Sequence, residues 1–286
     1  MKYAYYPGCS LHATAKEFDA SSRVVSRSLG IELEEIEDWS CCGATSAHAT
    51  NHFLSIALPA RNLALAARMG LDVAAPCAAC YNRLAGANKV MRNDKEMRRK
   101  VNDVIGAEYH GEVTVKSLLE VFASVERERI SSQVVKPLNN LKIACYYGCL
   151  LVRPPAVTGF DDPEQPVTMD RILQICGAET LEWGYKTECC GASLGLSREP
   201  VALRLVHDIL RMAVDAGADC LACACPLCQS NLDARQEHVN RAFGTKFKVP
   251  VFYFTQLIGL AMGISSRDLK VHSHFVDTSK VLQAIG

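Results

Sequence analysis

The sequence WSCCGA occupies residues 39–44, and a near copy, TECCGA, occupies residues 187–192. A Cys-x-x-Cys pair follows each copy at the same distance, since residue 77 lies 35 positions after residue 42 and residue 225 lies 35 positions after residue 190. A single cysteine precedes each copy, at Cys9 in YYPGC and at Cys149 in YYGC. This agreement indicates an internal repeat, which determines the interpretation of the rest of the chain.

The segments between the cysteines also repeat, and each half is predicted to run β-α-β-α-β-α-β-α. This order is typical of an α/β protein in which a mostly parallel sheet is flanked by helices. The polar tract Glu126–Asn140 is predicted to be a linker, so we expect two similar, pseudo-symmetric domains over residues 1–136 and 137–286. The predicted strands are Lys2–Tyr6, Ile31–Ile36, Val73–Ala75, Val113–Val115, Lys142–Tyr147, Ala178–Trp183, Cys220–Ala224 and Val249–Phe254. The clearest predicted helices are Phe53–Met69 and Val201–Ala216. Further helical regions are predicted at Tyr81–Val90 and Gln229–Ala242, and short closing helices at Lys116–Ala123 and Thr255–Met262.

The overall composition is that of an ordinary globular protein with many cysteines. The chain has 286 residues, 49% of them hydrophobic, with 31 basic side chains, 31 acidic side chains and 14 cysteines. Zero net charge argues against a nucleic acid or an anionic membrane as a partner, because both usually require a basic excess. The longest apolar run, Val251–Ile264, is too short for a membrane span, and the N-terminus lacks a signal-peptide pattern. We therefore expect a cytoplasmic protein whose reduced cysteines bind metal or carry out redox chemistry.

Each half carries five cysteines in one order: a single residue, an adjacent pair and a Cys-x-x-Cys pair. A structural zinc ion needs only four ligands, and two neighbouring residues can hardly both bind one tetrahedral ion. Adjacent thiolates can contact different metals of one polynuclear cluster, and all-thiolate ligation is normal for iron–sulfur clusters. We therefore favour iron–sulfur over zinc. The first cysteine set comprises Cys9, Cys41, Cys42, Cys77 and Cys80, and the second cysteine set comprises Cys149, Cys189, Cys190, Cys225 and Cys228.

The arrangement of Cys9, Cys41-Cys42-Gly43 and Cys77/Cys80, with its second copy, resembles the paired CCG domains of the HdrB subunit of heterodisulfide reductase. The resemblance extends to the closing segment Gln256–Gly263. It implies that each set binds a noncubane 4Fe-4S cluster, and that the two clusters lie at strand ends and face each other across the domain interface. It implies a catalytic subunit that cleaves or forms a small disulfide, such as that of coenzymes M and B. The implied partners are the ferredoxin-like subunit (HdrC) and the flavoprotein subunit (HdrA) of such a complex.

A second function stays open, because CCG domains also occur in other redox complexes. The chain also resembles subunits of lactate or glycolate oxidation complexes and of an unusual succinate:quinone reductase, where such a subunit relays electrons. A sulfur-oxidising complex of the heterodisulfide reductase type is a further alternative. Two complete motifs favour the disulfide reductase, and a zinc-stabilised structural module is retained as the simplest competing interpretation.

Four cysteines lie outside the two sets, and we interpret them as buried core residues, since small apolar cysteines are common in protein interiors. One of them, Cys145, could replace Cys149 as the single ligand of the second set. The alignment of the two Tyr-Tyr segments favours Cys149. The other three residues are Cys176, Cys220 and Cys223.

The histidines and one basic stretch have weaker signals. His48 and His52 follow the first Cys-Cys-Gly motif, where a hydrogen-bonded structural role is favoured over gating or proton donation. His272 and His274 are predicted to lie in a solvated tail, with a metal pair as the alternative. The stretch Lys89–Lys100 is predicted to form a solvated helical face, with docking of a redox partner as the alternative.

Overall fold

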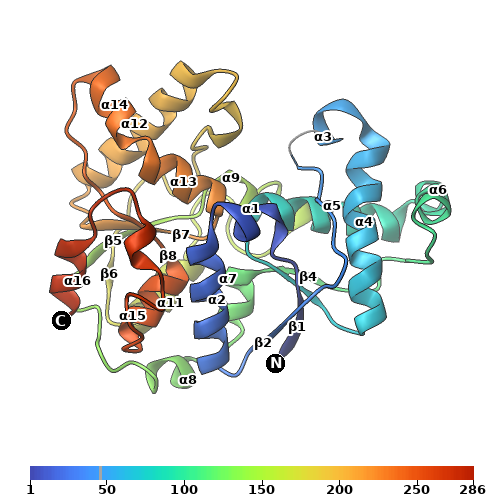
Figure 1. The fold of residues 1–286 in the computed structure, drawn as a ribbon, viewed down its shortest axis with the longest axis horizontal. Helices are drawn as coiled ribbons and strands as arrows, with labels where there is room; N and C mark the ends of the chain where they lie inside the picture. Colours follow the sequence, from blue (N-terminus) through green and yellow to red (C-terminus); the bar gives the residue numbers. More distant parts are fainter. Residues whose placement is uncertain (45–46) are drawn as a thin grey trace.

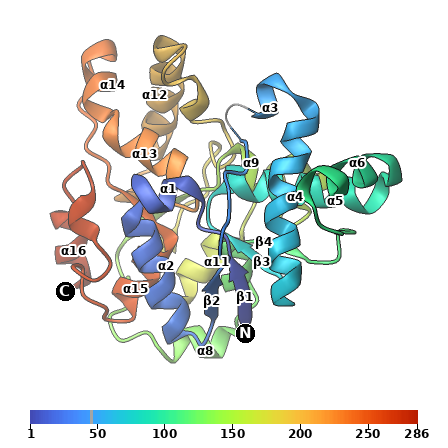
Figure 2. The same ribbon diagram turned by 45° about the vertical axis from the view of Figure 1, so that its right-hand side comes forward.

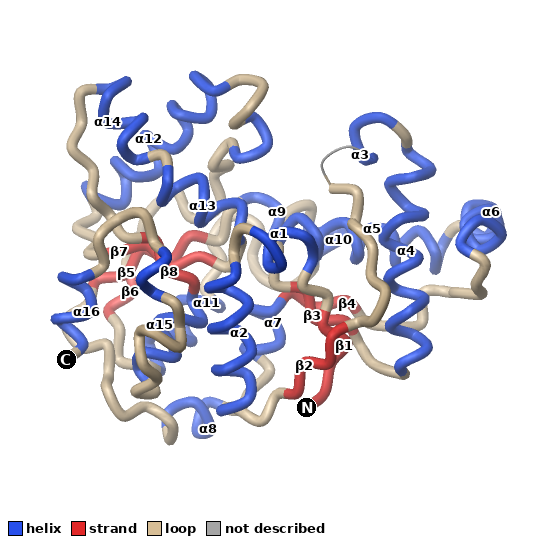
Figure 3. Tube along the Cα trace, viewed as in Figure 1, coloured by secondary structure: helices blue, strands red, loops and turns tan. Residues whose placement is uncertain are grey.

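The computed structural model describes residues 1–44 and 47–286, and it contains the predicted repeat. Two four-stranded parallel sheets have the same strand order, β2-β1-β3-β4 in the first half and β6-β5-β7-β8 in the second (Figure 3). The α/β class and the paired architecture are thus confirmed. The first half contains β1 (Lys2–Tyr5), α1 (Gly8–Ala13), α2 (Lys16–Ser28), β2 (Glu32–Glu35), α3 (Ala47–Thr50), α4 (His52–Met69), β3 (Val73–Ala75), α5 (Ala78–Asn93), α6 (Lys95–Ile105), β4 (Val115–Ser117), α7 (Leu118–Ala123) and α8 (Arg127–Ser131).

The second half has the same strand order, and it departs from the sequence prediction mainly at two places. The helix predicted over Gln229–Ala242 is interrupted at Arg235, which adopts φ −92° and ψ 1°, so two helices replace one. The strand predicted at Ala178–Trp183 shrinks to two residues. The elements are β5 (Lys142–Tyr146), α9 (Cys149–Val152), α10 (Pro155–Thr158), α11 (Thr168–Ile175), β6 (Glu179–Thr180), η1 (Ala192–Leu194), α12 (Glu199–Asp215), β7 (Cys220–Cys223), α13 (Pro226–Ala234), α14 (Gln236–Phe243), β8 (Val251–Tyr253), α15 (Phe254–Ala261), η2 (Val271–Ser273) and α16 (Ser279–Ile285).

Local sequence explains the long helix that follows the first Cys-Cys pair. The Asn51 side chain accepts a hydrogen bond from the Leu54 N–H at 3.0 Å and caps the start of α4. Gly70 ends the helix with φ 67°, a left-handed conformation that glycine adopts without the strain of a Cβ. The next strand, β3, is buried along its whole length, as expected for the interior of a parallel sheet.

The two halves pack through helices that lie between the sheets (Figures 1 and 3). Helix α2 packs against α15, and α7 packs against α11, so each half contributes its first long helix and its closing helix. Phe18 of α2 stacks on Tyr253 with ring centroids 4.1 Å apart. The hydroxyls of Ser21 and Thr255 lie 2.8 Å apart. The interface is therefore pseudo-symmetric and largely apolar.

A second part of the interface lies where the strands end. Helix α5 packs against α9 and α10 of the other half (Figure 3), and α13 contacts α1 in the same manner (Figure 2). The Tyr81 hydroxyl donates to the Thr158 carbonyl at 2.9 Å, and the Asn82 amide donates to the Arg153 carbonyl at 2.8 Å. These helices begin beside the cysteines, so this packing brings the two cysteine-bearing edges together.

Two predicted loop regions are more ordered than expected. The predicted linker Glu126–Asn140 contains α8, whose Ile130 is buried. The predicted solvated tail is wrong for His274, because its ring packs on Phe252 with centroids 5.1 Å apart and its Nε2 lies 3.0 Å from Gln256 Oε1. Burial lowers the pKa of His274 to about 4. In the described residues, no helix is long and apolar enough to cross a membrane.

Candidate metal centre

A glycine precedes the single cysteine of each set, and both glycines serve a close approach of the chain to a thiol. Gly8 has φ +68° and Gly148 has φ +67°, a region that other residues rarely adopt. A Cβ on Gly8 would lie 3.0 Å from the Cys80 sulfur, and a Cβ on Gly148 would lie 3.1 Å from the Cys228 sulfur. Glycine is thus required where the segment carrying the single cysteine meets the Cys-x-x-Cys pair.

The Cys-Cys-Gly turns are built alike in the two halves. The N–H of Gly43 points to the Cys41 sulfur at 3.4 Å, and the N–H of Gly191 points to the Cys189 sulfur at 3.3 Å. A backbone N–H aimed at sulfur favours the thiolate over the thiol. At Cys41, however, burial outweighs this N–H and raises the pKa, so the two turns share the geometry and not a common shift in pKa.

The second cysteine of each pair reaches the Cys-x-x-Cys pair. The sulfurs of Cys42 and Cys80 lie 3.4 Å apart, and those of Cys190 and Cys228 lie 3.7 Å apart. All four side chains are buried. Residues separated by 38 positions in sequence are thus side by side, at matching places in the two halves.

Thiol–thiol hydrogen bonds divide the protons unequally within each set. The hydrogen bond from Cys80 lowers the pKa of Cys42 to about 7, and the hydrogen bond from Cys149 lowers the pKa of Cys189 to about 6. The same bonds raise the pKa values of the donors, Cys80 and Cys149. The geometry therefore favours thiolates at Cys42 and Cys189 near neutral pH.

The two sets meet at the interface between the halves. The thiol of Cys77 shares a hydrogen bond with Cys225, the equivalent residue of the other half. Hydrogen bonds from Cys228 and Cys77 hold the pKa of Cys225 well below its usual range, and the Ala78 N–H adds to the shift. The first residues of α5 and α13 are thus adjacent near the centre of the pseudo-symmetric arrangement, and the cysteine sets lie on either side.

A buried tyrosine in each half was missed by the sequence reasoning. Tyr6 and Tyr146 have no exposed surface, and their hydroxyls donate to the carbonyls of Ser40 and Glu188 at 2.7 and 2.6 Å. Each accepting residue immediately precedes a Cys-Cys pair. Burial and the surrounding thiolates raise the pKa values of both tyrosines, so each ring stays neutral beside its set. The repeated tyrosine ahead of Gly-Cys was the available signal.

The tryptophans cover these tyrosines. The Trp39 ring lies edge-on to Tyr6 with centroids 5.5 Å apart, and the Trp183 ring lies 6.4 Å from Tyr146. His48 and His52 are exposed, and their side chains form no hydrogen bond with any residue the structure describes. The structural role predicted for these histidines is therefore not observed.

The four remaining cysteines are fully buried, in agreement with a core role. Cys145 lies inside β5, where burial and the charge of Asp170 raise its pKa. Cys149 begins α9 and interacts with Cys189. This geometry favours Cys149 over Cys145 as a member of the second set.

The donors suit an all-thiolate iron–sulfur group. Within residues 1–44 and 47–286, no three His, Cys, Asp or Glu side chains converge closely enough to be recognised as a site for one metal ion. The thiols instead form close pairs linked by the two glycine turns. An iron–sulfur cluster binds thiolates at several irons rather than at one. The fit of these residues to such a cluster therefore rests on two features, the all-thiol donor set and the placement of the thiols in close pairs.

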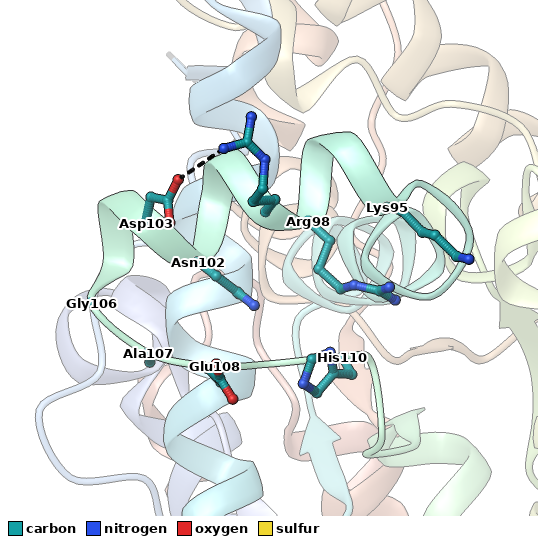
Figure 4. Close-up of a pocket in the computed structure, with 9 residues that line it drawn as sticks. Lys95, Arg98, Asn102, Asp103, Gly106, Ala107, Glu108 and His110 are labelled. Atoms are coloured by element: carbon teal, nitrogen blue, oxygen red, sulfur yellow. Dashed lines mark ion pairs between the residues drawn. The ribbon is translucent and has the colours of Figure 1, made fainter.

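A cavity of about 480 Å³ lies beside α6, far from the cysteines (Figure 4). The basic stretch predicted as one helical face is split here, because α5 ends at Asn93 and α6 begins at Lys95 with Asp94 as its cap. Arg99 pairs with Asp103 at 3.9 Å on the exposed side. No cysteine lines this cavity, so it does not belong to the candidate metal centre.

Comparison with known proteins agrees with this geometry. Residues 3–85 and 143–233 each match the cysteine-rich domain family known as CCG. The chain is 35% identical to the 8-methylmenaquinol:fumarate reductase membrane anchor subunit of Wolinella succinogenes, over 98% of this chain and 99% of that protein. It is 31% identical to the HdrB subunit of the ferredoxin/F420H2-dependent CoB-CoM heterodisulfide reductase of Methanosarcina acetivorans, over 99% of this chain and 97% of that protein.

A solved structure shows the same fold at low sequence identity. The crystal structure of a hypothetical protein from Helicobacter pylori aligns with a TM-score of 0.77 and 15% identity. The alignment covers 96% of this chain and 52% of that one, so the chain spans about half the length of the solved structure. This likeness supports the α/β architecture alone.

Proposed function

The chain belongs to the HdrB family of heterodisulfide reductase subunits and their relatives, which carry paired cysteine-rich domains, and on this basis we propose a catalytic role for it. It is an iron–sulfur oxidoreductase subunit of a multi-subunit complex. We propose that it cleaves or forms a small disulfide, such as that of coenzymes M and B, between two noncubane 4Fe-4S clusters. The proposed ligands are the ten cysteines of the first and second sets.

The observation that supports this proposal most strongly is the duplicated site that meets at Cys77 and Cys225. Cleaving a disulfide consumes two electrons and two protons and yields two thiols. Iron–sulfur clusters, when bound, supply electrons singly and offer iron to thiolate sulfur. Two equivalent sites that meet at one interface can therefore serve the two halves of one disulfide.

The chain's own residues orient the ligands and control access to them. Tyr6 and Tyr146 fix the backbone ahead of each Cys-Cys pair, and the tryptophans cover the tyrosines from water. Cys41 and Cys189 are exposed, so a small substrate can reach this side of each set from solvent. The buried cysteines of each set would serve as the ligands that solvent does not reach.

The proposed partners follow from the cysteine pattern. The chain lacks the C-x2-C-x2-C-x3-C-P run of ferredoxin-type clusters, so it depends on a partner for electrons. We propose a ferredoxin-like subunit (HdrC) and a flavoprotein subunit (HdrA) in that role. All fourteen cysteines are free, which fits a reducing compartment such as the cytoplasm.

The decisive experiment mixes the reduced, anaerobically purified protein with a small disulfide. We expect the electron paramagnetic resonance signal of the clusters to change, and two thiols to appear for each pair of electrons removed. The proposal is contradicted if the protein contains its clusters, its paramagnetic resonance spectrum does not change with any disulfide tested, and the reduced clusters are not reoxidised.

A second candidate function is an electron relay towards a quinone. Similarity to the Wolinella succinogenes fumarate reductase subunit favours it. The two functions differ in their electron acceptor, so reoxidation of the reduced protein by a menaquinone analogue, with no reoxidation by disulfides, would select the relay.

A further inference from the structure

The two halves differ at the position three residues after each Cys-x-x-Cys pair. Asn231 lies three residues after Cys228 on α13, and its buried amide donates to the Cys190 carbonyl at 2.6 Å. Side chains three apart share a helix face, so this position faces the Cys-Cys turn. In the second half, the Asn231 amide therefore ties α13 to the Cys189-Cys190 turn through this hydrogen bond.

The equivalent position of the first half is Arg83, three residues after Cys80 on α5. Its Nε atom is shielded from water and has no hydrogen-bond partner, and no described residue accepts a hydrogen bond from the guanidinium. Burial lowers the pKa of Arg83, while the negative charge of Cys42 acts in the opposite direction. Cys42 is the counterpart of Cys190, so Arg83 also faces the Cys-Cys turn. Unlike Asn231, it donates no hydrogen bond to a described residue of that turn.

An arginine in this state has unused binding capacity. A guanidinium carries five N–H donors in a planar fork that matches carboxylate, sulfonate and phosphate groups. Leaving such a group half-buried without partners is costly. By contrast, Arg235, half-buried at the end of α13, is partnered by the Gly195 carbonyl at 3.2 Å and by Glu199 at 3.4 Å.

We propose that Arg83 is an anion-binding residue beside the first cysteine set, and that it takes the acidic group of a small thiol or disulfide ligand. The inference rests on the proposed function for the identity of the molecule that carries the anion. Because Asn231 offers no charge at the second set, an unsymmetrical ligand binds with its acidic end towards the first half.

The test compares two thiols of nearly equal shape on the cluster-loaded protein. Binding of 3-mercaptopropionate and of neutral 3-mercaptopropanamide is followed by the visible and paramagnetic resonance spectra. We expect Arg83→Gln to weaken binding of the acid about tenfold to a hundredfold, as for loss of a charge-assisted hydrogen bond, and to leave the amide unchanged. Arg83→Lys restores part of the affinity, and Arg235→Gln alters neither.

A second measurement needs no variant and does not depend on thiol chemistry. Phenylglyoxal modifies accessible arginines, and the adduct on Arg83 is quantified by peptide mass spectrometry with and without propionate. We expect propionate to protect Arg83 and not Arg235. Absence of protection, or equal loss of acid and amide binding in Arg83→Gln, overturns the inference. Protection without any spectral response to thiols supports the inference and contradicts the proposed function.

Discussion

Replacing Gly148 with alanine tests whether the chain approaches the Cys-x-x-Cys thiol as closely as the structure describes. The added Cβ would lie 3.1 Å from the Cys228 sulfur, closer than an ordinary van der Waals contact. The backbone of Gly148, at φ +67° and ψ −177°, adds strain of about 1–3 kcal/mol for any residue with a side chain. A matched control is Gly244→Ala, because Gly244 has φ +69° and its Cβ would meet nothing within 4 Å.

Both variants place a side chain at positive φ, but the ψ of −177° at Gly148 is less favourable for a side chain than the ψ of 22° at Gly244. Gly148→Ala should therefore lose more stability than Gly244→Ala, and iron content is the measurement that isolates the contact with the thiol. Both should lose a few degrees of thermal midpoint, roughly 2–4 °C per kcal/mol for a chain of this size class. Only Gly148→Ala should also lose about half of the bound iron, because one of two clusters is displaced. Iron is measured against protein after anaerobic purification. Equal iron content in the two variants would refute the reasoning.

Three further predictions follow from single side chains. Cys190→Ala should lose about half of the iron, whereas Cys176→Ala should keep all of it; a loss of a full cluster's iron from Cys176→Ala contradicts the core assignment. Tyr146→Phe removes the 2.6 Å bond to the Glu188 carbonyl and should cost about 1–2 kcal/mol in thermal stability, and an unchanged midpoint argues against its positioning role. Burial lowers the pKa of His274 from 6.5 to about 4, so its contribution to stability is complete above pH 6.5 and is lost as the pH falls towards 4, by about 3 kcal/mol at most. His274→Gln should flatten this part of the wild-type midpoint curve, and an unchanged curve contradicts the shift.

The cysteine spacing and the periodicity were sufficient to predict the α/β halves. The strand at Val73–Ala75 has the predicted bounds, and the helix predicted over Phe53–Met69 begins one residue earlier, at His52, directly after the Asn51 cap. These features are local, because burial pattern and capping residues act within a few turns. The break at Arg235 depends instead on neighbouring elements, including the contacts of its side chain with Gly195 and Glu199.

Contacts between elements could not be predicted from spacing. The order of cysteines along the chain does not specify that Cys77 meets Cys225, because that contact depends on how α5 and α13 pack across the halves. The burial of His274 against Phe252 has the same origin. The hydrogen bond from Tyr146 to the Glu188 carbonyl also depends on tertiary structure, because it joins β5 to the residue before the second Cys-Cys pair.

The proposed chemistry depends on two iron–sulfur clusters held by the two cysteine sets. Anaerobic purification, followed by iron, sulfide and zinc analysis of the same sample, determines whether they are present. We expect about eight irons per chain with matching sulfide, from two clusters of four irons each. About two zinc ions per chain without sulfide would instead establish a structural zinc protein and rule out both clusters.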